Sequence, residues 1–326
     1  MSQTLGFTGD VMLGRLVNDH HRGGRPEIVW GSMRDELAGL DGLFMNLECT
    51  IATSGTPWNR TPRAFHFRAH PDWAIDALTD VGVDWVTLAN NHALDYEVEA
   101  LKETLDHLDE AGIRVGGAGR TPEEACQPSL VEIGSLRVGL LAVTDNTPEY
   151  AVSESQPGTC YTPLGTPARE RFSELLAELR ASDPDLIVAS LHWGPNMTTE
   201  PDEARRSLAH WLIGQGVDII HGHSAHVFHG IEVVDGRPIM YDTGDFVDDY
   251  AVDPTLRNDH SFLFTVTLDE TGEPVAIELI PTVIENYAVN RARDRSAAWC
   301  ISTMKARSSH LDTNFEETQE GLRLEL

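Results

Sequence analysis

Short apolar runs alternate along much of the chain with stretches whose apolar residues recur at helical spacing. The short runs indicate buried strands, and each ends in a cluster of polar residues. The predicted strands are 5–8, 43–46, 85–88, 136–143, 186–191 and 217–220. The predicted helices are 71–80, 96–111, 167–180 and 201–215. This βα alternation predicts a sheet covered by helices.

After about residue 228 the pattern changes to that of strands joined by hairpin turns such as Asp235-Gly236. The elements predicted for this part are strands at 230–234, 239–242, 261–268 and 275–281 and a helix at 288–307. We expect an antiparallel portion of the same domain, because no linker or internal repeat interrupts the chain. The predicted organisation is one α/β domain over 1–310 followed by a charged tail at 311–326.

Composition and charge narrow the classes of partner. The chain of 326 residues carries 24 Lys+Arg against 52 Asp+Glu, a formal net charge of −28. Nucleic acids and anionic membranes are polyanions that require a basic surface, so neither is an expected partner. With 41% hydrophobic residues the chain has enough apolar surface for a folded core.

The start of the chain and its cysteines indicate the compartment. No charged region followed by an apolar region opens the sequence, and no later segment has about 18 unbroken apolar residues, so we expect a cytoplasmic protein. The four cysteines lie far apart and form no C-x-x-C pair; they are Cys49, Cys126, Cys160 and Cys300. We interpret them as buried thiols in a reducing compartment.

Five polar clusters follow the apolar runs, each at the same place in a strand-helix unit. Loops at the carboxyl ends of neighbouring strands meet in one crevice, so these clusters can bring their side chains together. They supply carboxylates, an amide carbonyl and imidazoles, which are ligands for divalent cations. The predicted metal ligands are Asp10, Glu48, Asn91, His192, His223 and His226. Ordinary turns and helix caps are the alternative interpretation of the shorter clusters.

The same clusters resemble the CapA family, whose members are linked to poly-γ-glutamate capsule synthesis and resemble calcineurin-like metallophosphoesterases in fold. The motifs are, in chain order, Gly9-Asp10, Asn46-Leu47-Glu48, Asn90-Asn91-His92 with Asp95, His192-Trp193-Gly194, His223-Ser224-Ala225-His226 and Asp242-Thr243-Gly244-Asp245. The resemblance implies a β-sandwich flanked by helices, with a metal centre at the strand ends.

The phosphoesterase pattern implies a role for each ligand. By resemblance Asp10 and His226 hold one metal, Glu48 bridges, and Asn91, His192 and His223 hold a second metal. His92 would be the general acid or base beside the metals, and Asp95 would orient it.

Three departures from the superfamily pattern favour oxygen ligands. Met12 stands where a histidine is usual, Asn46-Leu47-Glu48 replaces the usual bridging motif, and two residues separate the last histidines. The site is therefore expected to hold one or two divalent ions, with Mn, Zn, Fe, Mg and Ca all compatible.

Two reactions and one non-catalytic role fit these residues. Hydrolysis of a peptide-like or poly-γ-glutamate-like substrate is slightly favoured. A peptide epimerase is the alternative, because some CapA-like proteins act in this way; His92 with Asp95 and a histidine such as His192 or His226 backed by Asp245 would exchange the Cα proton. A metal-stabilised accessory module of polymer synthesis is the third possibility.

Basic and aromatic residues supply candidate substrate contacts. Arg15, Arg60, Arg63 and Trp193 are predicted to bind a carboxylate-bearing substrate, and Arg68 belongs to the same basic concentration in the long segment 53–70. Surface ion pairs for the arginines and packing under the sheet for Trp193 are the alternatives. Asp248 and Asp249 are expected in a solvated turn.

Overall fold

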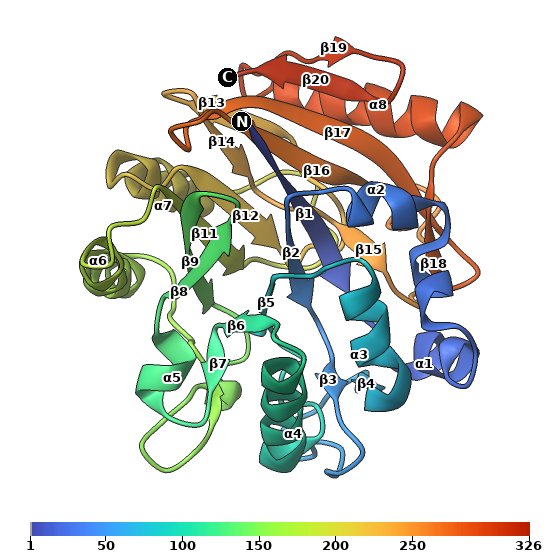
Figure 1. Ribbon diagram of the computed structural model, residues 1–326, viewed down its shortest axis with the longest axis vertical. Coiled ribbons are helices and arrows are strands. Elements are labelled where there is room, and N and C mark those ends of the chain that lie inside the picture. The colour runs from blue at the N-terminus through green and yellow to red at the C-terminus, as the bar shows by residue number, and fades with distance from the viewer. Residues whose placement is uncertain (1) are drawn as a thin grey trace.

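Apolar residues occupy both faces of the central strands, so each strand must pack against other elements on both faces. In β11 (Leu186–His192), Leu186 and Val188 pack into one apolar cluster while Ile187 and Ala189 pack into another. The computed structural model, which describes residues 2–326, meets this demand with two sheets packed face to face and helices on both outer sides (Figure 1). The predicted α/β class, a β-sandwich flanked by helices, is confirmed.

The first sheet joins parallel and antiparallel strands. Along the path β19-β20-β17-β16-β1-β2-β5-β6, the part from β1 to β6 is parallel, and the part from β1 towards β19 is antiparallel. Its strands are β1 (Gln3–Val11), β2 (Gly42–Leu47), β5 (Trp85–Thr87), β6 (Arg114–Gly116), β15 (Asp245–Val247), β16 (His260–Leu268), β17 (Pro274–Glu285), β18 (Ala288–Arg291), β19 (Glu316–Glu317) and β20 (Leu322–Glu325).

The second sheet has the order β13-β14-β12-β11-β9-β8, and its central strands are parallel. Its strands besides β11 are β8 (Ser129–Ile133), β9 (Leu136–Thr144), β12 (Ile219–His223), β13 (Ile231–Val234) and β14 (Arg237–Met240). Two short pairs lie outside both sheets: β3 (Thr50–Ile51) with β4 (Arg68–Ala69), and β7 (Ala118–Gly119) with β10 (Gly158–Thr159).

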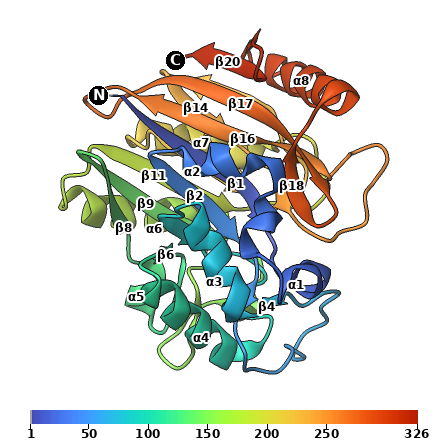
Figure 2. The same cartoon turned by 45° about the vertical axis from the view of Figure 1, so that its right-hand side comes forward.

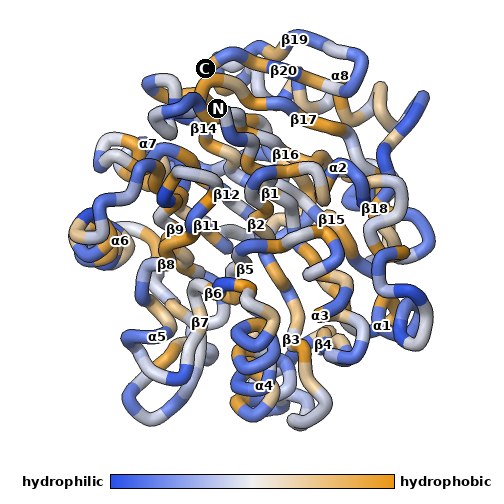
Figure 3. The backbone as a smooth tube through the Cα atoms, in the orientation of Figure 1, coloured by the Kyte–Doolittle hydropathy of each residue, from blue (hydrophilic) through white to orange (hydrophobic). Residues whose placement is uncertain are grey.

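Helices cover the outer faces, and α8 packs on the C-terminal strands (Figure 2). They are α1 (Arg15–His21), α2 (Arg34–Ala38), α3 (Pro71–Asp80), α4 (Glu97–Glu110), α5 (Pro122–Cys126), α6 (Thr166–Arg180), α7 (Glu203–Gly214) and α8 (Asp294–Ser309), with 3-10 helices at Pro26–Met33 and Pro148–Tyr150. Apolar segments concentrate in the central strands and polar segments in the outer loops (Figure 3).

The C-terminal region corrects two expectations. The predicted helix at 288–307 is wrong in its first part, because Ala288–Arg291 forms β18 and pairs with β17 after a turn in which Asn286 and Tyr287 have positive φ. The segment 311–326, expected as a charged tail, contributes β20, which pairs with β17 through Leu322 and Leu324. Charged residues alternate with these leucines, so the segment's composition hides a strand with one apolar face.

The cysteines do not all behave as predicted. The sulfurs of Cys126 and Cys160 form a disulfide between the end of α5 and the residue after β10, although 34 positions separate them in sequence. The expectation of four free thiols is therefore wrong for this pair, whereas Cys49 and Cys300 are buried thiols. Within residues 2–326, none of the helices combines the length and apolar character needed to cross a bilayer. Cytoplasmic localisation stays a prediction.

The core between the two sheets generates a stability prediction. Phe44 is fully buried on β2, and its ring lies 5.5 Å from that of Phe7 and 6.4 Å from that of Trp85. We expect Phe44→Ala to lower the free energy of unfolding by about 3–5 kcal/mol, measured by urea denaturation, because it leaves a cavity between the sheets. Val252→Ala, at an exposed position, is the control and should change it by less than about 0.5 kcal/mol. Equal effects of the two substitutions on the free energy of unfolding would contradict the placement of Phe44 in the main core.

Candidate metal centre

The interior faces of two neighbouring strands change from apolar to polar towards their carboxyl ends. In β11 the sequence on this face is Val188, Ser190 and His192, and in β12 it is Ile219, His221 and His223. The two strands pair in register, with His192 opposite His223. Since alternate residues of a strand share a face, this register places four polar side chains in two rows at the carboxyl ends of β11 and β12.

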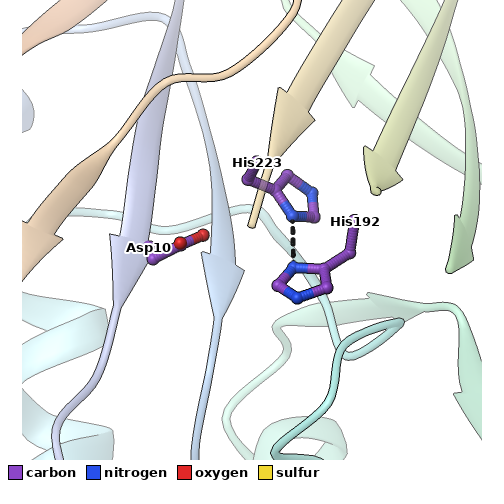
Figure 4. A group of neighbouring side chains, drawn as sticks. All are labelled: Asp10, His192 and His223. Atoms are coloured by element: carbon purple, nitrogen blue, oxygen red, sulfur yellow. Dashed lines mark hydrogen bonds between the residues drawn. The ribbon is translucent and has the colours of Figure 1, made fainter. Parts of the chain in front are cut away.

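The opposite sheet supplies carboxylates to the same place. Asp10 near the end of β1 pairs in register with Asn46 on β2 and with Asp245 on β15. Asp10 and Glu48 are both fully buried. Figure 4 shows the Asp10 carboxylate pointing from β1 towards the imidazoles of His192 and His223.

Two groups of potential ligand atoms meet here, and Asp10 belongs to both. The first group is Asp10, His192 and His223, and the second is Asp10, Glu48 and His226; within each, the ligand atoms lie within 4.8 Å of one another. The structure thus brings together five of the six predicted metal ligands. Asn91, the sixth, has a buried Oδ1 atom without a hydrogen-bond partner within the described chain.

Asn46 contacts several members of this cluster. The sequence identifies the motif that contains Asn46, but it does not indicate this role. Its amide nitrogen donates to Asp10 Oδ1 at 2.7 Å and to Glu48 Oε2 at 3.1 Å, and it lies 3.5 Å from His192 Nδ1. Its carbonyl oxygen accepts a hydrogen bond of 3.0 Å from Asn90. A neutral donor between two carboxylates reduces their mutual repulsion without adding charge.

A hydrogen-bond chain determines the tautomer of His223. His221 Nε2 must donate to the Thr8 carbonyl at 2.8 Å, so its Nδ1 accepts from the Ser190 hydroxyl at 3.2 Å. Ser190 Oγ then accepts from His223 Nε2 at 3.0 Å. His223 Nδ1 therefore carries a lone pair, and it faces His192 Nδ1 at 2.8 Å. The spacing of Ser190 and His221, each two residues before a predicted ligand, is the sequence signal for this chain.

The environment keeps these imidazoles neutral. Burial lowers the pKa of His192 to about 3 and that of His221 to about 4, and it lowers the pKa of His223 well below its ordinary value. Neutral imidazole is the form that binds a metal ion. Burial and the charge of Asp10 raise the pKa of Glu48 well above its ordinary value, which disfavours the ionised form of this carboxyl group.

His226 lies between carboxylates of the first sheet. Its Nδ1 is 2.8 Å from Asp245 Oδ1 and 3.1 Å from Asp10 Oδ2. Burial alone would lower the pKa of His226, but the two carboxylates raise it well above its ordinary value. Its φ of 60° is in the left-handed region, which is rare for a residue other than glycine and common at functional sites.

Asp248 corrects the expectation of a solvated turn. Its side chain is buried, and burial together with the charge of Asp245 raises its pKa well above its ordinary value. Asp249 also has a buried side chain, and it pairs with Arg15 at 3.3 Å. The short strand β15 carries this segment into the sheet beside β1, which the acidic composition does not indicate.

His92 and Asp95 form the predicted proton-transfer pair. Nδ1 of His92 lies 2.6 Å from Asp95 Oδ2, and both side chains are buried. Asp95 also accepts hydrogen bonds from the Phe67 amide at 2.7 Å and from the Tyr150 hydroxyl at 3.3 Å. Since Nδ1 of a neutral imidazole donates to Asp95, Nε2 carries the lone pair, and it lies 3.8 Å from Glu48 Oε1.

A cavity of about 440 Å³ opens onto this cluster, and its lining includes Asn91, His92 and His226. Arg63, Phe65, Met197 and Tyr250 contribute to its walls. The predicted site residues Asn91, His92, His226 and Arg63 therefore share one accessible space.

The remaining predicted substrate contacts lie elsewhere. Arg15 lines a neighbouring cavity. Arg60 pairs with Glu97 and stacks on Trp58, as in the ion-pair alternative. Trp193 is buried in the apolar layer under α6 and α7, where its indole nitrogen donates to the Tyr241 carbonyl at 2.8 Å, as in the packing alternative.

The donor set fits a divalent cation. Asp10 Oδ2, Glu48 Oε1 and Asn91 Oδ1 are buried oxygens without hydrogen-bond partners among residues 2–326, and the neutral imidazoles of His192 and His223 lie near Asp10. Burying an oxygen without a hydrogen-bond donor costs free energy unless a cation compensates it. Met12, in contrast, is buried in the apolar layer under the first sheet and offers no ligand here.

Comparisons with known proteins agree with this architecture. The family model described as "Bacterial capsule synthesis protein PGA_cap" matches residues 4–250. A "Probable polyglutamine synthesis accessory protein" of Mycobacterium tuberculosis is 32% identical over 91% of this chain and 89% of that protein. The "PGA biosynthesis protein CapA" of Bacillus subtilis is 28% identical over 92% of this chain and 80% of that protein. A hypothetical protein from Thermus thermophilus shares the fold, with a TM-score of 0.50 and 21% identity over 85% of this chain and 98% of that one.

Asp10 is expected to be the ligand on which metal affinity depends most, because it belongs to both donor groups. Asp10→Asn should weaken Mn²⁺ binding by at least about tenfold, measured by isothermal titration calorimetry. Asp76→Asn, at an exposed position of α3, is the control and should bind as the unaltered protein does. Unchanged affinity in Asp10→Asn would remove Asp10 from the ligand set.

Replacing Asn46, the neutral donor between Asp10 and Glu48, should reveal how strongly these two carboxylates repel each other. Asn46→Asp adds a third buried carboxylate, so in chelator the free energy of unfolding should fall by about 1–3 kcal/mol. Added Mn²⁺ should raise the melting temperature of this variant more than that of the unaltered protein. Exposed Asn59→Asp is the matched control. Equal melting temperatures in chelator would show that Asn46 does not separate charged groups.

Proposed function

Because the chain belongs to the bacterial capsule synthesis protein family, we propose that it is a metal-dependent hydrolase acting on a peptide-like or poly-γ-glutamate-like substrate. The names of the Mycobacterium and Bacillus relatives connect those proteins with polyglutamine or PGA synthesis, which supports the substrate class. The observation that carries the proposal is the arrangement of two donor groups sharing Asp10 beside the His92–Asp95 pair, all near one cavity.

The ligand assignment follows from the donor groups. Asp10, His192 and His223 would hold one divalent ion, and Asp10, Glu48 and His226 would provide the donors for a second. Asp10 is the shared carboxylate in this assignment, in place of Glu48, and the Asn91 carbonyl oxygen adds a neutral donor. When bound, the metal supplies an activated water and polarises the bond to be cleaved.

His92 moves the proton of the reaction. Its Nε2 lone pair is available because Asp95 accepts the Nδ1 proton, and the Phe67 amide and Tyr150 hydroxyl hold that carboxylate in place. The imidazole can therefore take a proton at Nε2 and deliver it to the leaving group. Asp95 keeps the ring orientation and tautomer through this exchange.

The cavity walls bind and orient the substrate. Arg63 contacts Glu149 at 3.2 Å and stacks on Tyr150, which fixes its guanidinium at the edge of the cavity. Phe65 and Met197 are exposed apolar residues on the same walls. Together they suit a chain that carries both carboxylates and aliphatic segments.

A second candidate function is peptide epimerisation, which one observation favours. His92 and His226 both line the cavity, and each has its Nδ1 within 2.8 Å of a carboxylate, Asp95 or Asp245. Two imidazoles paired with carboxylates around one space can remove a Cα proton from one side and return it from the other. In this arrangement His226 acts on the substrate and does not bind metal.

The proposed role of His92 predicts separable effects on turnover and metal content. His92→Ala should reduce cleavage of poly-γ-glutamate, measured by size-exclusion chromatography, by at least about 100-fold because the proton-transfer group is lost. Metal content by elemental mass spectrometry should stay unchanged. His310→Gln, at an exposed position, is the control.

The outcome distinguishes the three functions. Loss of metal in His92→Ala would make His92 a ligand and contradict its role as acid and base. Deuterium incorporation at a peptide Cα without cleavage would establish the epimerase. A metal-loaded protein that binds poly-γ-glutamate without changing it would establish the accessory role and overturn the hydrolase.

A further inference from the structure

A second cavity, of about 410 Å³, lies beside the one at the metal centre and is lined by basic residues. Its lining contains Arg15, Arg22, Arg68, His66 and His70, and among the described residues Asp19 is the one carboxylate that lines it. This concentration is notable because acidic residues outnumber Lys and Arg by 52 to 24 in the chain. A pocket of local positive charge in an acidic protein indicates an anionic ligand.

Arg68 has a guanidinium that no carboxylate neutralises within residues 2–326. It donates to the Ser54 carbonyl at 3.1 Å and stacks 4.1 Å from the ring centre of Tyr96. Both contacts orient the guanidinium and leave its charge uncompensated. An arginine held in this way is preorganised to bind a carboxylate or a phosphate.

The other two arginines differ in how firmly they are paired. Arg22 lies 3.4 Å from Asp72, and both side chains are about half exposed, so water screens the pair. Arg15 is held more firmly, because its Nη1 is buried and lies 3.3 Å from Oδ1 of Asp249, whose side chain is fully buried. Arg22 and Arg68 can therefore offer hydrogen-bond donors to a ligand, and Arg15 lies on the wall towards Phe65.

One aromatic layer separates this cavity from the metal centre. The guanidinium of Arg15 lies 4.3 Å from the ring centre of Phe65, and Phe65 lines the cavity at the metal centre. Behind it, the ring centre of Phe67 lies 4.7 Å from that of His92. Phe65 is exposed, so a ligand chain can cross its edge from one cavity to the other.

We propose that the basic cavity binds carboxylates of the acidic substrate chain while another part of that chain reaches the metal centre across Phe65. This inference rests on the proposed function, since it names a second binding point for the same substrate. Carboxylates and phosphates share the oxyanion chemistry that arginine recognises, and the repeated charges of a polyglutamate chain match a cavity with three arginines. Binding at two points also holds a polymer in register at the reacting bond.

The test measures binding without turnover. A fluorescein-labelled γ-linked decaglutamate is titrated with metal-loaded protein, and anisotropy is recorded at low and high salt. Arg22→Gln combined with Arg68→Gln should weaken binding by at least about tenfold. The single variant Arg22→Gln, which removes only a weak exposed pair, should weaken it measurably and covers the case in which the double variant misfolds.

A matched control separates the cavity from net charge. Arg169→Gln combined with Arg171→Gln on α6 makes the same change in charge away from both cavities and should leave binding unchanged. Equal weakening by both double variants, or no weakening by either cavity variant, would overturn the inference. Binding of inorganic phosphate by a protein that does not bind the decaglutamate would also overturn the carboxylate assignment.

Failure of this inference can be distinguished from failure of the proposed function. If the decaglutamate binds through Arg22 and Arg68 but is never cleaved, the cavity assignment stands and the hydrolase is contradicted. If it is cleaved and the double variant binds it as the unaltered protein does, the hydrolase stands and the basic cavity is not its binding point.

Discussion

Two buried carboxylates, Asp10 and Glu48, hydrogen-bonded to the same amide of Asn46, set the conditions for the rest of the site. Burying two negative charges close together is costly unless donors or cations compensate them. Two neighbours supply part of that compensation: Asn46 on β2 donates to both carboxylates, and His226 after β12 lies 3.1 Å from Asp10. The fold is consistent with a cation as the final compensating group.

Several side chains of the candidate metal centre are oriented by a second contact. The chain from Thr8 through His221 and Ser190 determines which nitrogen of His223 is free. Asp95 accepts the Nδ1 proton of His92 and so leaves the Nε2 atom of His92 free. Positioning of this kind costs little at the moment of reaction, because the fold has already ordered the groups. Met12 is buried in the apolar layer under the first sheet and adds no ligand to the donor set.

The proposed acidic substrate and this acidic protein repel each other at long range, and solvent ions screen that repulsion within about 10 Å. Local contacts then decide binding, and the basic cavity concentrates positive charge where the long segment 53–70 meets α1. The aromatic layer of Phe65 and Phe67 keeps this cavity apart from the metal centre. The guanidinium groups therefore do not neutralise the carboxylates of the candidate metal centre.

The sequence by itself determined the central strands, the longer helices and the polar clusters at the strand ends, because periodicity and strand-end position are local properties. The β-sandwich was implied by the resemblance to a known family, and the sequence pattern did not indicate the strands β18 and β20. Only the tertiary structure decided which side chains of these clusters meet. It revealed Asn46, Ser190 and His221 as the groups that hold the ligands, and it placed Trp193 in the core and Arg60 in an ion pair. It also joined Cys126 to Cys160 and placed Asp248 inside the fold. Strand register and sheet packing relate residues far apart in the chain, so no local pattern contains that information.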